Sequence, residues 1–118
     1  VSASSAYAIL KKGAVLLDVR QPGEIESKAF DVPDQLHIPL GRLEQRLDEI
    51  PKDRKVIVAC HSGNRSLVAA RVLMNQGYQK VQNLQHGILM WEQEGLPIRV
   101  GSKQGMFSRI QQMFSGQS

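Results

Sequence analysis

The stretch that decides the fold is Val56-Ile57-Val58-Ala59-Cys60-His61-Ser62-Gly63-Asn64-Arg65-Ser66. Its first four residues are apolar and mostly β-branched, which predicts a strand buried on both faces. A polar loop containing Gly63 follows. Apolar residues then recur at helical spacing and predict a helix over residues 67–76, with Ser66 as the cap of its first turn. Cys60 is the only cysteine of the chain and lies where the strand ends.

The position of Cys60 has a chemical consequence. A loop that wraps over a helix N-terminus directs several backbone N–H groups at one centre, and the helix dipole adds positive potential there. We therefore expect the thiol to ionise below its usual pKa of about 8.5, with help from Arg65. The alternative is an inert buried cysteine. Such a cysteine does not require the glycine, arginine and other polar residues that follow it here, so the pattern favours a reactive thiol.

The same loop resembles the active-site loop of the rhodanese family of sulfurtransferases, whose pattern is Cys-Arg-x-Gly-x-Arg or Thr. Cys60, Gly63 and Arg65 match this pattern, whereas His61 replaces the usual arginine. Further segments resemble family landmarks in the family's order. They are Leu16-Leu17-Asp18-Val19-Arg20 with Pro22 and Glu24, His37-Ile38-Pro39-Leu40, Asn83-Leu84 with Gly87-Ile88 and Trp91, and Gly95-Leu96-Pro97.

The resemblance implies a three-layer α/β/α fold with a mostly parallel central sheet of four to five strands, formed by residues 1–98 as one domain. The alternation of helical and apolar segments also predicts a parallel sheet covered on both faces. The expected helices cover residues 3–12, 24–28, 40–50, 67–76 and 87–94; the expected strands cover 1–2 as a stub, 14–19, 36–38, 56–59 and 80–83; residues 29–35 are expected to be irregular. Because ligands bind at the carboxyl ends of parallel strands, Cys60 and Asp18-Val19-Arg20 are predicted to share one rim.

The family's activity implies that Cys60 accepts a sulfane sulfur from a small anionic donor such as thiosulfate. The resulting persulfide would pass its sulfur to cyanide or a thiol. The expected substrate-binding residues are His61, Ser62, Gly63, Asn64, Arg65 and Ser66. The N–H groups of this loop would stabilise the anions, and the fork of Arg65 suits a sulfonate-like group. His61 could donate a hydrogen bond to the substrate, titrate near neutral pH, or point to solvent.

Asp18 and Arg20 are expected to support the site. Asp18 stands in an otherwise apolar strand and needs a hydrogen-bonded reason to be there. A structural role, either fixing the loop after its strand or pairing with an arginine, is favoured over proton transfer. Arg20 would be that partner or would help to frame the site.

Three other functions are compatible with parts of the sequence. Phosphatases and arsenate reductases of this fold use Cys-x-x-x-x-x-Arg, but Cys60 and Arg65 enclose four residues, a smaller loop better suited to one sulfur atom. A non-catalytic interaction module would lack the cysteine. A persulfide carrier, which receives sulfur from a protein partner, is the main alternative to an enzyme that uses a small donor.

The amino-acid composition narrows the remaining classes of function and partner. The net charge is +4, with 42% hydrophobic and 22% charged residues, which is ordinary for a soluble protein. The basic residues are scattered and not interleaved with aromatics, so we expect no nucleic acid partner. No run has membrane-spanning length. One cysteine and three histidines without ligand spacing predict no disulfide, metal or cofactor, and we expect a monomer.

The C-terminal residues 99–118 differ in character from the rest. Their apolar side chains recur at three- and four-residue steps and predict an amphipathic helix: Met106, Phe107, Ile110, Met113 and Phe114. This stripe would pack back on the domain, bind a protein partner, contact a membrane surface, or belong to a disordered end. The chain begins with Val1, so it is expected to be processed or to be a segment of a longer chain. We predict a cytoplasmic location, with a periplasmic one as the alternative.

Overall fold

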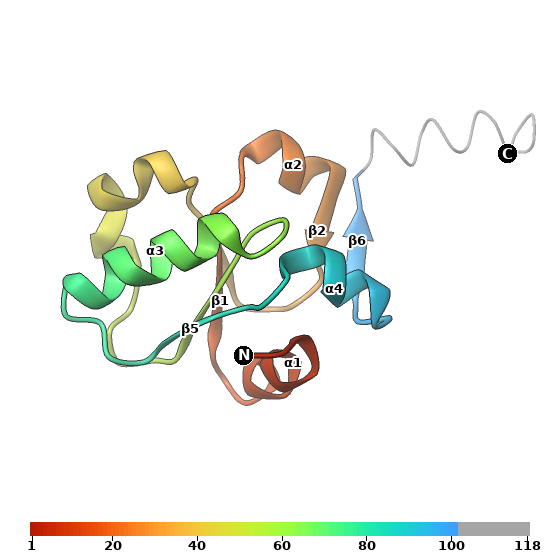
Figure 1. Ribbon diagram of the computed structural model, residues 1–118, viewed down its shortest axis with the longest axis horizontal. Helices are drawn as coiled ribbons and strands as arrows, with labels where there is room; N and C mark the ends of the chain where they lie inside the picture. The colour runs from red at the N-terminus through yellow and green to blue at the C-terminus, as the bar shows by residue number, and fades with distance from the viewer. Residues whose placement is uncertain (102–118) are drawn as a thin grey trace, which may run out of the picture.

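The computed structural model describes residues 1–101, which form an α/β fold around one parallel sheet (Figure 1). The sheet has four strands in the order β3-β1-β4-β5. Along the chain the elements are α1 (Ala3–Lys11), β1 (Val15–Asp18), α2 (Pro22–Ser27), β2 (Lys28–Phe30), β3 (Gln35–His37), the 3-10 segment η1 (Leu40–Glu49), β4 (Val56–Ala59), α3 (Asn64–Asn75), β5 (Val81–Asn83), α4 (Gly87–Gln93) and β6 (Ile98–Val100). The predicted three-layer fold with a mostly parallel sheet is confirmed.

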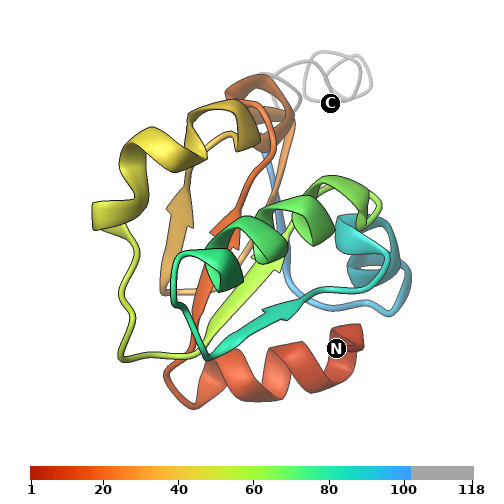
Figure 2. The ribbon, with the colours of Figure 1, turned by 60° about the vertical axis from the view of Figure 1, so that its left-hand side comes forward.

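Helices cover both faces of this sheet, and the strands are buried because of it. α1 and α4 lie on one face, while α3 and η1 lie on the other (Figures 1 and 2). Successive strand residues therefore enter different cores: Val56 and Val58 of β4 pack with α3 and η1, whereas Ile57 and Ala59 pack with α1 and α4. This burial on both faces explains why the sequence of β4 is an uninterrupted run of apolar residues.

The register of the central strands sets the position of the site. β1 and β4 are parallel, with Asp18 opposite Ala59. β4 and β5 are also parallel, with Val58 opposite Asn83. Because parallel strands end at one edge of a sheet, the carboxyl ends of all three meet at the same rim. Cys60 is the first residue beyond β4 at this rim.

A second small sheet was not expected. Residues 28–30 form β2, which pairs antiparallel with β6, with Ala29 opposite Arg99. The prediction that residues 29–35 are irregular is therefore wrong for the first part of that segment. β6 also continues to Val100, two residues beyond the predicted domain end. Strands of three residues carry little periodicity, and their pairing partner lies about seventy positions away, so no local pattern predicts them.

Three other local expectations need correction. Residues 1–2 form no strand, although the Val1 amino group donates to the Asn83 carbonyl (2.8 Å) beside β5. The predicted helix over 40–50 is a 3-10 segment with non-helical dihedrals at Arg46. Ser66 does not cap α3: Gly63 is the N-cap, and Ser66 is buried inside the first turn.

The predicted tail helix lies outside the described residues. Within residues 1–101, no helix is both long enough and apolar enough to cross a membrane.

Candidate active site

The loop from Cys60 to Gly63 joins β4 to α3 and encloses the thiol. Gly63 has φ +105°, a left-handed conformation that glycine adopts without strain. A Cβ at this position would stand 2.9 Å from the backbone nitrogen of His86, so the loop also needs glycine for close approach. The tight turn brings the N-terminus of α3 over the end of β4, as the sequence predicts.

Backbone N–H groups converge on the sulfur of Cys60. Its Sγ accepts hydrogen bonds from the N–H of Gly63 (3.1 Å) and from the N–H of Ser66 (3.3 Å). Burial raises the pKa of Cys60, but the hydrogen bond between its side chain and that of Ser66, together with those from the N–H groups of Ser66, Gly63 and Ser62, outweighs this effect. The pKa of the thiol is therefore lowered, because these donors stabilise the charged form.

The Ser66 hydroxyl connects the thiol to the end of β5. The thiol of Cys60 donates to Ser66 Oγ at 3.4 Å, and the Ser66 hydroxyl donates to Oδ1 of Asn83. The Asn83 amide also donates to the Gly63 carbonyl at 3.5 Å. Asn83 thus contacts the loop at Gly63 and the first turn of α3 at Ser66.

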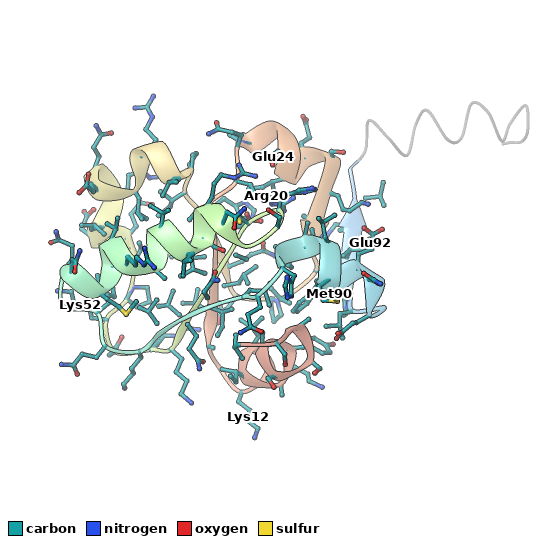
Figure 3. All side chains as sticks on the ribbon, in the orientation of Figure 1. Lys12, Arg20, Glu24, Lys52, Met90 and Glu92 are labelled. Carbon is teal, nitrogen blue, oxygen red and sulfur yellow. The ribbon has the colours of Figure 1, made fainter. Side chains whose placement is uncertain are left out.

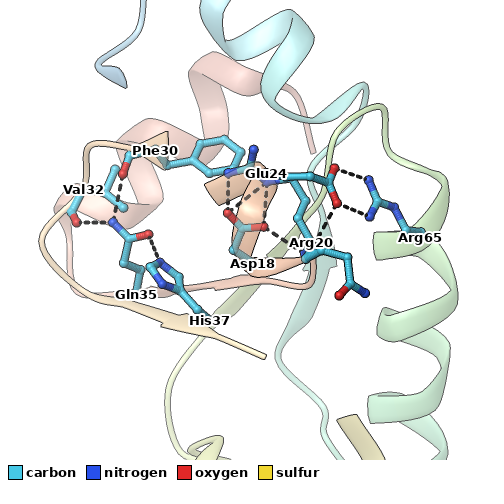
Figure 4. A network of polar contacts seen from close by, with 9 residues as sticks. Asp18, Arg20, Glu24, Phe30, Val32, Gln35, His37 and Arg65 are labelled. Carbon is cyan, nitrogen blue, oxygen red and sulfur yellow. Dashed lines mark hydrogen bonds and ion pairs between the residues drawn. The ribbon is translucent and has the colours of Figure 1, made fainter. Parts of the chain in front are cut away.

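Arg65 forms an ion pair with Glu24 of α2. Its Nη1 and Nη2 atoms donate to the two carboxylate oxygens, each at 2.8 Å (Figure 4). The hydrogen bond from Arg65 holds the pKa of Glu24 at about 2, well below its usual value of 4.5. Arg65 was expected to act as a fixed cation beside the thiol and the donor. In this structure its fork is turned to Glu24, and the groups that donate to Sγ are the loop N–H groups.

Asp18 and Arg20 form a buried pair at the end of β1. Nη2 of Arg20 donates to Oδ2 of Asp18 at 2.7 Å, and Nε donates to Oδ1 at 2.9 Å. The Arg20 backbone N–H also donates to Oδ1 (3.2 Å), so Asp18 both pairs with an arginine and fixes the turn after its strand. Both side chains are at most 2% exposed. Figure 3 places Arg20 and Glu24 close together near the N-terminal end of α3, with Lys52 at the opposite end.

The N-terminus of α4 holds the other side of the loop. The N–H groups of Ile88 and Leu89 donate to the carbonyls of Cys60 (3.0 Å) and His61 (3.3 Å). Gly87 makes this contact possible: its φ is +56°, and a Cβ there would lie 2.4 Å from both carbonyl oxygens. The loop is therefore fixed from β5 and α4 as well as from α3.

The predicted loop residues differ in accessibility. His61, Ser62 and Asn64 are exposed, whereas Cys60 is 1% exposed and Ser66 is fully buried. A hollow of about 350 Å³ adjoins the loop and is lined by Ser62, Gly63, Asn64, Asn83, Gln85 and His86. Within residues 1–101, no three His, Cys, Asp or Glu side chains are grouped so that they could hold a metal ion.

Sequence reasoning missed Asn83 and Glu24 as contacts of the predicted loop. Asn83 could have been suspected, because it is a polar residue at the end of a strand next to β4. Glu24 carries no comparable signal. It lies 41 residues from Arg65, and its place at the start of α2 is explained by a capping interaction with the Gln21 N–H (3.0 Å).

The fold is α/β, and its cysteine accepts hydrogen bonds from N–H groups at the carboxyl end of a parallel strand, surroundings that favour a nucleophilic thiol. The family model described as Rhodanese-like domain matches residues 2–94. This chain therefore belongs to the rhodanese-like domain family, as the loop and its flanking segments predict.

Individual relatives agree with this assignment. The chain is 46% identical over 84 residues to a sulfurtransferase of Allochromatium vinosum, covering 71% of this chain and 77% of the relative. It is 35% identical over 86 residues to the thiosulfate sulfurtransferase GlpE of Pseudomonas syringae, covering 73% and 79%. The crystal structure of a rhodanese-related protein from Thermoplasma volcanium matches with a TM-score of 0.75 and 29% identity, covering 84% of this chain and 95% of that one. The relatives support sulfur transfer as the broad activity.

Proposed function

We propose that this protein moves a sulfane sulfur from thiosulfate to a thiophilic acceptor through a persulfide on Cys60. The observation that carries the proposal is the set of N–H groups directed at Sγ, from Gly63 at 3.1 Å and Ser66 at 3.3 Å. These donors favour the thiolate, which is the form that attacks sulfur. Similarity to relatives named sulfurtransferases supports the same reaction class.

The reaction consists of two displacements. In the first, the Cys60 thiolate attacks the outer sulfur of thiosulfate, a new S–S bond forms, and the S–S bond of the donor breaks to release sulfite with its electron pair. In the second, cyanide attacks the terminal persulfide sulfur and leaves as thiocyanate, which regenerates the thiolate. Charge balances in each step, and no oxidant or reductant is consumed. The loop N–H groups would remain in place to stabilise the anionic sulfur throughout.

The accessibility of the loop suits the transfer of a single atom. Cys60 is 1% exposed, so a donor must present a narrow terminal atom to reach Sγ. His61, Ser62 and Asn64 are exposed around it and are the side chains proposed to contact the rest of the donor. Cys60 and Arg65 enclose four residues, one fewer than in the phosphatase pattern, so the loop is smaller. This loop size favours sulfur transfer over phosphoryl transfer.

Intact-protein mass spectrometry tests the proposal. Incubation with thiosulfate should add the mass of one sulfur atom, and subsequent cyanide should remove it and release thiocyanate. Cys60→Ala should show neither change, because it removes the only thiol of the chain. A sulfur adduct that persists in Cys60→Ala would contradict the assignment of the nucleophile.

Donor variation separates the enzyme from a carrier. If thiosulfate gives no adduct but a persulfidated protein does, thiosulfate is the wrong donor and the carrier alternative is favoured. Either reaction requires a reduced thiol, which a cytoplasmic location would maintain. The cytoplasmic location, the monomeric state and the role of the C-terminal residues stay predictions.

A further inference from the structure

The Ser66 hydroxyl lies between two hydrogen-bond partners. One is Sγ of Cys60, 3.4 Å away, and the other is Oδ1 of Asn83. Ser66 is fully buried, and a hydroxyl has one hydrogen to donate. In the structure the thiol donates to Ser66 Oγ and the hydroxyl donates to Asn83, so the three side chains form a chain of hydrogen bonds that runs away from the sulfur.

This chain cannot persist unchanged when Cys60 loses its proton. The thiolate has no hydrogen to donate and becomes an acceptor. Because a hydrogen bond to an ionised group is stronger than one between neutral groups, the Ser66 hydroxyl gains by turning to the sulfur. This rotation of the hydroxyl breaks its hydrogen bond to Asn83 and leaves the amide oxygen without that donor, which costs free energy. Asn83 and the thiolate therefore compete for one hydrogen.

We propose that Asn83 is a positioning residue for Cys60: its side-chain carbonyl holds the Ser66 hydroxyl in the orientation that accepts the thiol hydrogen and releases it to the sulfur when the anion forms. The inference deepens the proposed function and rests on it, because the sulfur of Cys60 would alternate between protonated and anionic forms there. Competition of this kind moderates the stability of the thiolate. An over-stabilised thiolate is a weaker nucleophile, so the competition preserves reactivity.

Other charged or titratable groups lie around the thiol and must stay constant in any test. They are His61 in the loop, His86 beside it, the Arg65–Glu24 and Asp18–Arg20 pairs, and the Val1 amino group on the Asn83 carbonyl. A double-mutant cycle between Asn83 and Ser66 leaves them all in place. Their contribution to the pH midpoint of alkylation therefore cancels when the coupling between Asn83 and Ser66 is calculated.

The experiment measures the rate of Cys60 alkylation by iodoacetamide against pH, without any sulfur donor. Asn83→Leu removes the competing acceptor, and we expect it to lower the pH midpoint of alkylation by about one pH unit, a tenfold change in the thiolate ratio. Ser66→Ala should raise the midpoint, because the hydroxyl no longer reaches the sulfur. Asn83→Leu added to Ser66→Ala should produce no further shift. Gln82→Leu is the matched control, since Gln82 is the exposed neighbour on β5.

Several results would overturn the proposal. An unchanged or raised midpoint in Asn83→Leu would mean that Asn83 does not compete for the hydrogen. An equal shift with and without the Ser66 hydroxyl would show that Asn83 acts by another route. If Asn83→Leu does not fold, Asn83→Asp keeps the side-chain shape and binds the hydroxyl more strongly, so its midpoint should rise, and by less in the Ser66→Ala background. Because alkylation needs no sulfur donor, these outcomes are independent of whether thiosulfate forms a persulfide.

Discussion

Replacing Gly87 with alanine should destabilise the protein far more than the same change at Gly95. Both glycines have positive φ, +56° at Gly87 and +74° at Gly95, so alanine is strained at each by about 1 kcal/mol. The surroundings of the two positions differ. A Cβ at Gly95 meets nothing within 4 Å, whereas a Cβ at Gly87 lies 2.4 Å from the carbonyl oxygens of Cys60 and His61. Gly95→Ala is therefore the matched control.

The size of the difference follows from what must move. The atoms that clash with the new Cβ are backbone, so the loop and the N-terminus of α4 must separate. That movement breaks or weakens the hydrogen bonds from the N–H groups of Ile88 to Cys60 (3.0 Å) and of Leu89 to His61 (3.3 Å). The two weakened bonds cost about 1 kcal/mol each, and the strain of positive φ adds about 1 kcal/mol. The total loss of stability is therefore about 3 kcal/mol for Gly87→Ala, compared with about 1 kcal/mol for Gly95→Ala, which has the strain alone.

Urea denaturation of the two variants measures this difference directly. We expect both variants to keep the slope of the wild type and to differ in midpoint. The rate of Cys60 alkylation at fixed pH should change in Gly87→Ala and stay unchanged in Gly95→Ala, because only the first displaces the loop. Equal losses of stability in the two variants would refute the claim that close backbone approach, rather than φ alone, requires glycine at position 87.

Two further predictions concern the charged pairs. Glu24→Gln should cost about 1 kcal/mol at pH 7, because the pair with Arg65 is about one-third exposed. The pKa of Glu24 is about 2 in the folded protein and 4.5 ordinarily, so this stabilisation is complete above pH 4.5 and is lost as the pH falls towards 2. Urea titrations from pH 7 to pH 3 should therefore show the free energies of unfolding of the wild type and the variant converging. A difference that stays constant with pH would contradict the assigned pair. Asp18→Asn should cost about 3–5 kcal/mol, because it leaves the buried charge of Arg20 without its partner. A loss below about 1 kcal/mol in thermal or urea unfolding would contradict that role.

The sequence alone predicts much of the fold. The strand over residues 56–59 has the bounds that the structure gives it, and the helices that follow Cys60 and Gly87 are found within three residues of their expected ends. These features are local: an apolar run buried on both faces, helical spacing, and glycines where the chain reverses. The apolar run over residues 56–59 also predicts that the thiol lies at the end of a buried strand. Because Asp18 lies near the end of another predicted parallel strand, the sequence predicts that the two residues share one rim of the sheet.

The tertiary structure decided which side chains meet. Arg65 pairs with Glu24 across 41 residues, and the Ser66 hydroxyl reaches Asn83 across 17. Short strands β2 and β6 pair across a still longer interval. Such partners are chosen by how the layers pack and by where a loop closes, and no periodicity in the chain encodes either. The sequence thus determined where a reactive thiol would stand and that backbone N–H groups would face it, while packing determined that the Ser66 hydroxyl meets Asn83 and that the arginine is turned to a carboxylate.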